Sequence, residues 1–201
     1  MDKAFQIILD FVEGRLPAKE FEQVVYNDPS LERTLKDDSL RWHGTYIKSD
    51  PYDYLIGLDY DDPGGRLNAQ GAMEMFLQRK GVLFQSDRAA SDLHSLLMAA
   101  QPKWLDVDTA YLAKRVLPDA GSRTGRELRD WLRVRLEQLF RYHRKPPKWI
   151  QSPAWPITEN GPMYFFGQIN LDNCEHFHDE AAAYLFFDPK TRETRTVIQV
   201  F

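Results

Sequence analysis

Two histidines and the only cysteine of the chain lie together in the segment Cys174-Glu175-His176-Phe177-His178. In an extended backbone, His176 and His178 would project from one face, and imidazole nitrogens at that spacing can bind a transition metal. A metal site needs a third and usually a fourth ligand, and the sequence marks no residue for either position. The segment also suits a polar loop between strands, so we expect no bound metal and no other cofactor.

Aspartates and tyrosines are concentrated between Asp50 and Asp62, which include five Asp and three Tyr. The alternating Asp pattern and distal Glu of a calcium-binding loop are absent, and nothing positions a catalytic pair of carboxylates. Tyrosines beside carboxylates are typical of a surface that binds a basic protein site, although a solvated acidic loop would have the same composition. We predict a partner-binding surface made of Asp50, Tyr52, Asp53, Tyr54, Asp59, Tyr60, Asp61 and Asp62.

The motifs of common enzyme classes are missing from the sequence. It has no glycine-rich phosphate-binding loop and no Gly-x-Ser-x-Gly nucleophile motif. Acidic neighbours of Cys174 disfavour the thiolate that a nucleophilic cysteine needs. We therefore expect that the protein is not an enzyme. A metal-dependent hydrolase that uses His176, His178 and the acids of residues 59–62 remains the alternative.

Charge is distributed unevenly along the chain, whose net charge is −4. Residues 1–122 hold 14 Lys and Arg against 20 Asp and Glu, whereas residues 123–148 hold 9 against 3. An acidic body favours a basic protein partner and disfavours nucleic acid. The basic stretch could instead contact RNA, but spacings such as Glu137 to Arg141 also predict ion pairs on a helix surface.

No apolar run reaches the roughly 20 residues of a membrane span, and the first residues do not resemble a signal peptide. We expect a cytoplasmic protein without a membrane partner.

Apolar spacing predicts helices over most of the first 145 residues. The clearest are residues 3–13, a helix after Pro17, residues 67–79 and residues 123–143. Residues 48–60 suit either a strand or a buried helix, and Asp61-Asp62-Pro63-Gly64-Gly65 predicts a turn. Ser30 is predicted to cap a short helix.

The last quarter of the chain predicts strands at residues 163–169, 181–187 and 194–201, with a tight turn at residues 188–191. The predicted fold class is therefore α+β, with a mostly helical N-terminal body packed on a small antiparallel C-terminal sheet. We expect the helical body to comprise residues 1–145 and the β subdomain residues 146–201, packed together as one compact unit.

Aromatic residues and prolines alternate at the start of this C-terminal part. Trp155-Pro156, Gly161-Pro162-Met163 and Phe165-Phe166-Gly167-Gln168-Ile169 resemble a segment of the bacterial YwqG-like family. Trp149 and Trp155 have apolar or proline neighbours, so we expect them to anchor the proline-rich segment.

The opening of the chain, Phe11-Val12-Glu13-Gly14-Arg15-Leu16-Pro17 followed by Phe21-Glu22, resembles small immunity proteins of bacterial toxin systems. The resemblance implies a protein that binds a cognate toxin, occludes its active site and brings no catalytic residues. A hydrolase and an RNA-contacting accessory protein remain the alternative functions.

Overall fold

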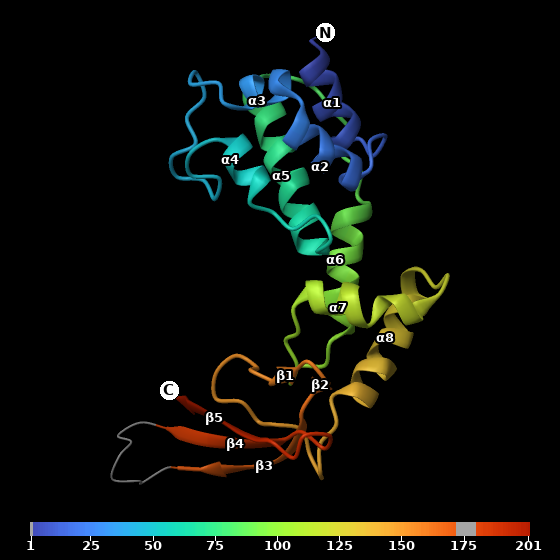
Figure 1. The fold of residues 1–201 in the computed structure, drawn as a ribbon, viewed down its shortest axis with the longest axis vertical. Coiled ribbons are helices and arrows are strands. Elements are labelled where there is room, and N and C mark those ends of the chain that lie inside the picture. Colours follow the sequence, from blue (N-terminus) through green and yellow to red (C-terminus); the bar gives the residue numbers. More distant parts are fainter. Residues whose placement is uncertain (1, 172–179) are drawn as a thin grey trace. The chain divides into compact units, whose positions relative to one another are not determined.

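The computed structural model describes residues 2–171 and 180–201. Contacts divide the chain into two compact units, Met1–Ser95 and Leu96–Phe201, called here the helical unit and the C-terminal unit. The division falls inside α6 (Ala89–Ala100), whereas the sequence predicts a boundary at residue 146, where helices give way to strands. The α+β fold class, with helices first and antiparallel sheets last, is confirmed (Figure 1).

The helical unit is built from short helices with polar N-caps. Asp2 caps the first of them, and Asp28 accepts hydrogen bonds from the backbone N–H groups of Ser30 and Leu31. The predicted cap at Ser30 is therefore wrong, because Pro29 occupies the first helical position and places Asp28 at the cap. The helices are α1 (Lys3–Val12), α2 (Ala18–Asn27), α3 (Pro29–Leu35), α4 (Pro51–Ile56) and α5 (Pro63–Arg79).

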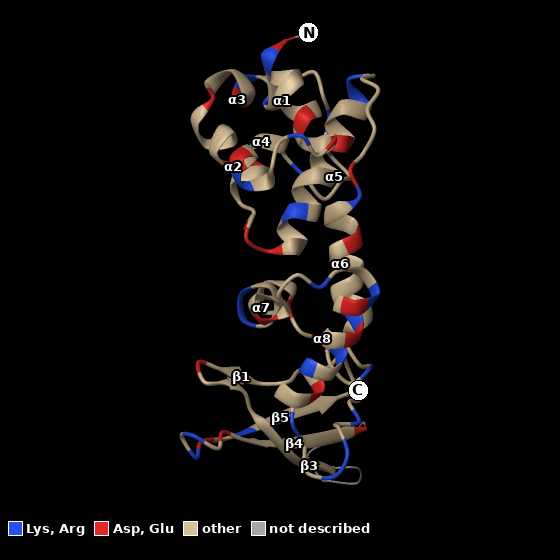
Figure 2. Cartoon of the chain, turned by 90° about the vertical axis from the view of Figure 1, so that its right-hand side faces the viewer, with Lys and Arg blue, Asp and Glu red and all other residues tan. Residues whose placement is uncertain are grey.

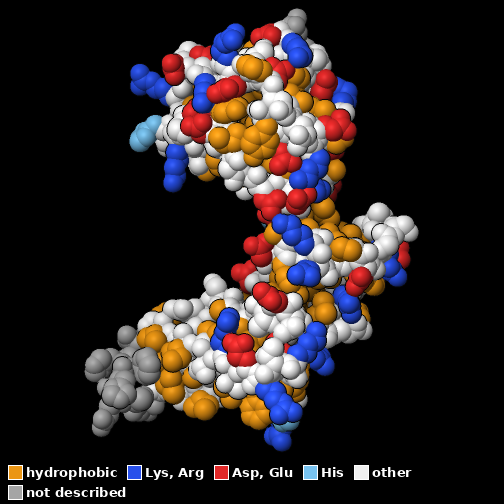
Figure 3. Space-filling model, viewed as in Figure 1, with side chains coloured by type: hydrophobic (Ala, Val, Ile, Leu, Met, Phe, Trp, Pro, Cys, Tyr) orange, Lys and Arg blue, Asp and Glu red, His pale blue; other side chains and the backbone are white. Residues whose placement is uncertain are grey.

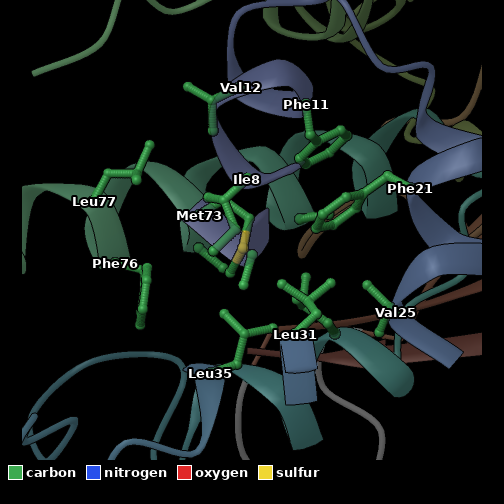
Figure 4. Close-up of a cluster of buried hydrophobic side chains, with 14 of the residues drawn as sticks. Ile8, Phe11, Val12, Phe21, Val25, Leu31, Leu35, Met73, Phe76 and Leu77 are labelled. Atoms are coloured by element: carbon green, nitrogen blue, oxygen red, sulfur yellow. The ribbon is translucent and has the colours of Figure 1, made fainter. Parts of the chain in front are cut away.

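The core of the helical unit consists of aliphatic and aromatic side chains from these helices (Figure 4). Phe11 and Phe21 stack with their ring centroids 3.9 Å apart. The helices surround α5, whose Met73, Phe76 and Leu77 are fully buried. The predicted apolar stripe of α1 is buried at Ile8, Leu9 and Val12.

The C-terminal unit begins with helices and ends with strands. Its helices after α6 are α7 (Thr109–Arg115), the 3₁₀ turn η1 (Leu117–Ala120) and α8 (Gly125–Leu139). Strands β3 (Tyr164–Asn170), β4 (Ala181–Phe187) and β5 (Thr194–Val200) form an antiparallel sheet in the order β3-β4-β5. A second small sheet pairs β1 (Ile157–Thr158) with β2 (Gly161–Pro162).

Aromatic side chains fill the core of the C-terminal unit. Trp155 is buried, and its ring lies 5.5 Å from that of Phe140 and 5.4 Å from that of Phe186. Trp149 lies 4.4 Å from the ring of Tyr184 and donates a hydrogen bond to the Trp104 carbonyl. The proline-rich segment is thus held against β4 by two tryptophans. Among the described residues, no helix has both the length and the apolar character that a membrane span requires.

Candidate functional site

The predicted surface begins at α4, which the sequence left open between strand and helix. Asp50 accepts a 2.9 Å hydrogen bond from the Asp53 N–H, and Pro51 occupies the first helical turn. These two residues start the helix, because an aspartate cap satisfies a free N–H and proline fits the first position. The carboxylate of Asp50 therefore has a structural role.

The predicted turn at residues 61–65 is confirmed only at Asp61 and Asp62, because residues 63–65 form the start of α5. The two carboxylate oxygens of Asp62 accept hydrogen bonds of 3.1 Å from the N–H groups of Gly64 and Gly65, so Pro63 opens α5. Asp59 accepts a 2.8 Å hydrogen bond from the Asp61 N–H. Turn residues and helix-capping residues are the same types, which is why the sequence pattern predicts a turn here.

Three aspartates of the segment, Asp53, Asp59 and Asp61, are exposed, and two of them form ion pairs with lysines. Asp53 lies 3.5 Å from the Lys36 ammonium, and Asp61 lies 2.8 Å from that of Lys19. About half of each of these two carboxylate side chains is exposed, and ion pairs of this kind contribute little to stability. A basic group of a partner protein can therefore replace Lys19 or Lys36 in its ion pair with little loss of stability.

The tyrosines of the segment differ in position. Tyr60 is only 1% exposed and packs against Phe21 in the core, so its prediction as a partner-binding residue is wrong. Its hydroxyl has no hydrogen-bond partner among the described residues, and burial raises its pKa well above the usual range. Tyr52 is half-buried beneath Lys36, whose ammonium lies 4.8 Å from the ring centroid.

Tyr54 is half-buried and pairs with a tyrosine that the sequence analysis did not select. The rings of Tyr54 and Tyr46 meet edge to face, with centroids 5.4 Å apart. Partial burial raises the pKa of both hydroxyls, so both are neutral at pH 7. Tyr46 is 48% exposed.

Two further exposed side chains belong to this region, Tyr26 of α2 and Ile56 at the end of α4. Tyr26 of α2 is 51% exposed and donates a 3.1 Å hydrogen bond to the carbonyl of Ile56, itself partly exposed. Tyr26 lies off the buried stripe of α2, so the helical period could have identified it as a surface aromatic. Figure 3 shows hydrophobic side chains gathered on this face of the helical unit, with acidic side chains beside them. We call this set the acidic tyrosine surface: Tyr26, Tyr46, Tyr54, Ile56, Asp53 and Asp61.

The surface belongs to a strongly acidic unit. Residues 1–95 hold 17 Asp and Glu against 11 Lys and Arg, whereas residues 96–201 hold 13 against 15. The field around the helical unit therefore attracts basic partners, most strongly at low salt.

A cavity of about 230 Å³ lies elsewhere in the helical unit, between the end of α1 and the start of α5. Its polar lining is already engaged within the chain. Arg66 donates to the Tyr60 carbonyl, and Gln70 donates to the Asp87 carbonyl. Both side chains are thus used in hydrogen bonds within the chain, so we do not assign a ligand to this cavity.

The hydrolase alternative depends on residues that the structure describes only in part. Cys174, His176 and His178 lie outside the described residues. Within residues 2–171 and 180–201, no group of three or more His, Cys, Asp or Glu side chains could hold a metal ion.

Three of the four arginines of α8, Arg126, Arg129 and Arg135, form ion pairs. Arg126 and Arg129 both pair with Asp130, and Arg123, just before α8, pairs with Glu127. Figure 2 shows acidic and basic residues interspersed along α8. The surface of this helix therefore carries ion pairs, which were the expected alternative to RNA contact.

No protein-family model, curated protein or solved structure matches the chain.

Proposed function

We propose that the protein is an immunity protein that acts in the cytoplasm, binds a cognate bacterial toxin and blocks the active site of that toxin. The observation that carries the proposal is the acidic tyrosine surface, where Tyr26 and Tyr46 contact residues of α4 and are about half exposed, as are the carboxylates of Asp53 and Asp61. Aromatic residues supply much of the binding energy of protein interfaces, and exposed charges set the rate of encounter.

The chemistry of the surface favours a toxin with a basic site, such as a nuclease. Carboxylates such as Asp53 and Asp61 can occupy positions that substrate phosphates would take, because both present anionic oxygens to Lys and Arg. Tyr46 and Tyr54 would then pack on the rim of the site and exclude substrate. Steric occlusion requires no catalysis by the immunity protein.

Growth protection tests the proposal. The protein encoded beside this gene is tested as the toxin, and its active domain is expressed alone or together with the full-length chain. We expect growth arrest by the toxin alone and restored growth on co-expression. The variant Tyr26→Ala/Tyr46→Ala should lose protection while keeping its circular dichroism spectrum. Leu83→Ala, which removes an exposed apolar side chain of the same unit, should protect fully. Continued arrest with the wild-type protein would refute the proposal.

A further inference from the structure

Four cations of the C-terminal unit lack the ion pairs that Arg126, Arg129 and Arg135 of α8 form. Lys103, Arg144, Lys145 and Lys148 line two surface grooves, and no ion pair involves them in the part of the chain that the structure describes. Neither groove has an Asp or Glu in its lining. Three of the four arginines of α8 thus form ion pairs, whereas Arg144, Lys145 and Lys148 form none among the described residues.

That segment, residues 143–148, is called here the basic strap, and β3 holds both of its ends. The His143 N–H donates a 3.0 Å hydrogen bond to the Phe165 carbonyl, and the Lys148 N–H donates a 2.7 Å bond to Gln168 Oε1. Between these points Pro146 and Pro147 lack the N–H groups that would continue the pairing. The strap is therefore anchored at both ends, and Arg144 and Lys145 between these anchors are exposed.

Aromatic rings accompany the cations in both grooves. The groove of about 390 Å³ contains Phe166, which is 58% exposed and has His143 stacked on it at 5.7 Å and 18°. The shift in strand pairing between Phe165 and Gly167 is a β-bulge, and bulges redirect side chains. The groove of about 490 Å³, on Lys103, Lys145 and Lys148, contains half-buried Trp104 and Trp149. Figure 3 shows hydrophobic and basic side chains together at the lower end of this unit.

We propose that the basic strap and its two grooves bind single-stranded nucleic acid. Uncompensated cations attract phosphates, and exposed rings accept bases whatever their sequence, a combination typical of sites for unpaired strands. An acidic peptide would use the cations but has no bases to stack on Phe166. The net charge of the whole chain predicts no nucleic-acid ligand, but the charge at the strap has the opposite sign. The proposal is independent of toxin binding.

Fluorescence anisotropy of labelled 20-nucleotide oligo(U) and oligo(dU), which differ only in the 2′-hydroxyl, with the full-length protein tests the proposal. We expect dissociation constants in the range of about 10⁻⁶ to 10⁻⁴ M near physiological salt. Four phosphate contacts predict a slope of log K against log salt of roughly −3, from about −0.7 for each contact. Tighter binding of oligo(U) would show that a 2′-hydroxyl contributes, and equal binding would show recognition of phosphates and bases alone. Both results agree with the proposal.

Variants separate the two contributions. Lys145→Ala/Lys148→Ala should reduce the slope by roughly 1.4 and weaken binding, whereas Phe166→Ala should weaken binding by about fivefold or more with the slope unchanged. Arg126→Ala/Arg129→Ala removes two paired cations and should bind as the wild type does. The proposal is overturned if neither oligonucleotide binds at 50 mM salt, or if the α8 variant loses as much affinity as the strap variant. It is also overturned if a poly-glutamate peptide binds as tightly as the oligonucleotides.

Discussion

The indole Nε1 of Trp155 donates a 2.8 Å hydrogen bond to the carbonyl of Met163, and both residues are buried. This bond closes the β1-β2 hairpin over the core and joins the Trp-Pro and Gly-Pro-Met parts of the segment that resembles the YwqG-like family. The same indole contacts the rings of Phe140, Phe165 and Phe186. Trp155 therefore links the end of α8, the proline-rich segment and the sheet.

Replacement of Trp155 tests this linking role. Trp155→Ala should lower the free energy of unfolding by about 3–5 kcal/mol, the range for large aromatic truncations in cores. Trp155→Phe keeps most of the ring contacts but leaves the Met163 carbonyl unpaired, at a cost of about 1–3 kcal/mol. Urea denaturation measures both, and Trp131→Ala, at a half-buried position on α8, should cost less. Unchanged stability of Trp155→Ala would instead favour a recognition role for this side chain.

Gly65 is required by the close approach of the chain at the start of α5. A Cβ atom there would lie 2.0 Å from the Asp59 carbonyl oxygen, so the backbone would have to move. Gly65→Ala should therefore destabilise the protein by about 1–3 kcal/mol or more, as overpacking does.

Gly57→Ala is the matched control, because its Cβ would meet ordinary contacts at 3.5 Å and its φ is negative. It should be neutral or stabilise by up to about 1 kcal/mol, since alanine restricts the unfolded chain. Thermal melts compare the stability of Gly65→Ala with that of Gly57→Ala. Equal melting temperatures would contradict the proposed clash at residue 65.

The carboxylate of Asp188 organises the turn between β4 and β5. It accepts hydrogen bonds from the N–H groups of Lys190 and Thr191 and from the side chains of Asn160 and Thr158. The bond from Lys190, aided by those from Asn160, Thr191 and Thr158, outweighs desolvation and holds the pKa of Asp188 below its usual value. Because the folded state favours the ionised form, Asp188 stabilises the protein fully above the unfolded pKa of about 3.9. This contribution is lost as pH falls through the lowered folded pKa.

Asp188→Asn should therefore be less stable than the wild type at pH 7, and the difference should shrink as pH falls below about 4. Urea midpoints at pH 7 and pH 3 measure it. Glu159→Gln, an exposed acid in the neighbouring turn, serves as the control. A stability difference that is constant with pH would show that the ionised carboxylate does not hold this turn.

Regular patterns in the sequence predicted the elements, while contacts between distant residues decided their ends. The strand at residues 181–187 has the predicted bounds, because its apolar run is bounded by turn residues. The helix predicted over residues 123–143 ends at Leu139, since the Phe165 N–H donates to the Arg141 carbonyl and draws the chain toward β3. Helical periodicity contains no information about that pairing.

Only part of the candidate surface was predicted, because contacts between distant residues also decide which side chains are exposed there. Composition identified Asp53 and Asp61, but Asp50 and Asp62 cap helices and Tyr60 is buried. Whether a tyrosine in an irregular segment points inward depends on the packing around it. No repeating pattern of apolar residues in the sequence indicates that packing. Tyr26 and Tyr46 join the surface from other segments, so only the fold brings them beside α4.

Association kinetics with the cognate toxin test the central claim most directly. Rates are measured by biolayer interferometry at several salt concentrations for the wild type and for Asp53→Asn/Asp61→Asn, which spares the capping residues Asp50 and Asp62. Asp92→Asn/Asp106→Asn removes the same charge at exposed positions elsewhere. We predict a tight complex whose on-rate falls with salt, a severalfold slower on-rate and a flatter salt dependence for Asp53→Asn/Asp61→Asn, and a control with rates close to wild type. Absence of a complex, or equal effects of the two variants, would contradict the account.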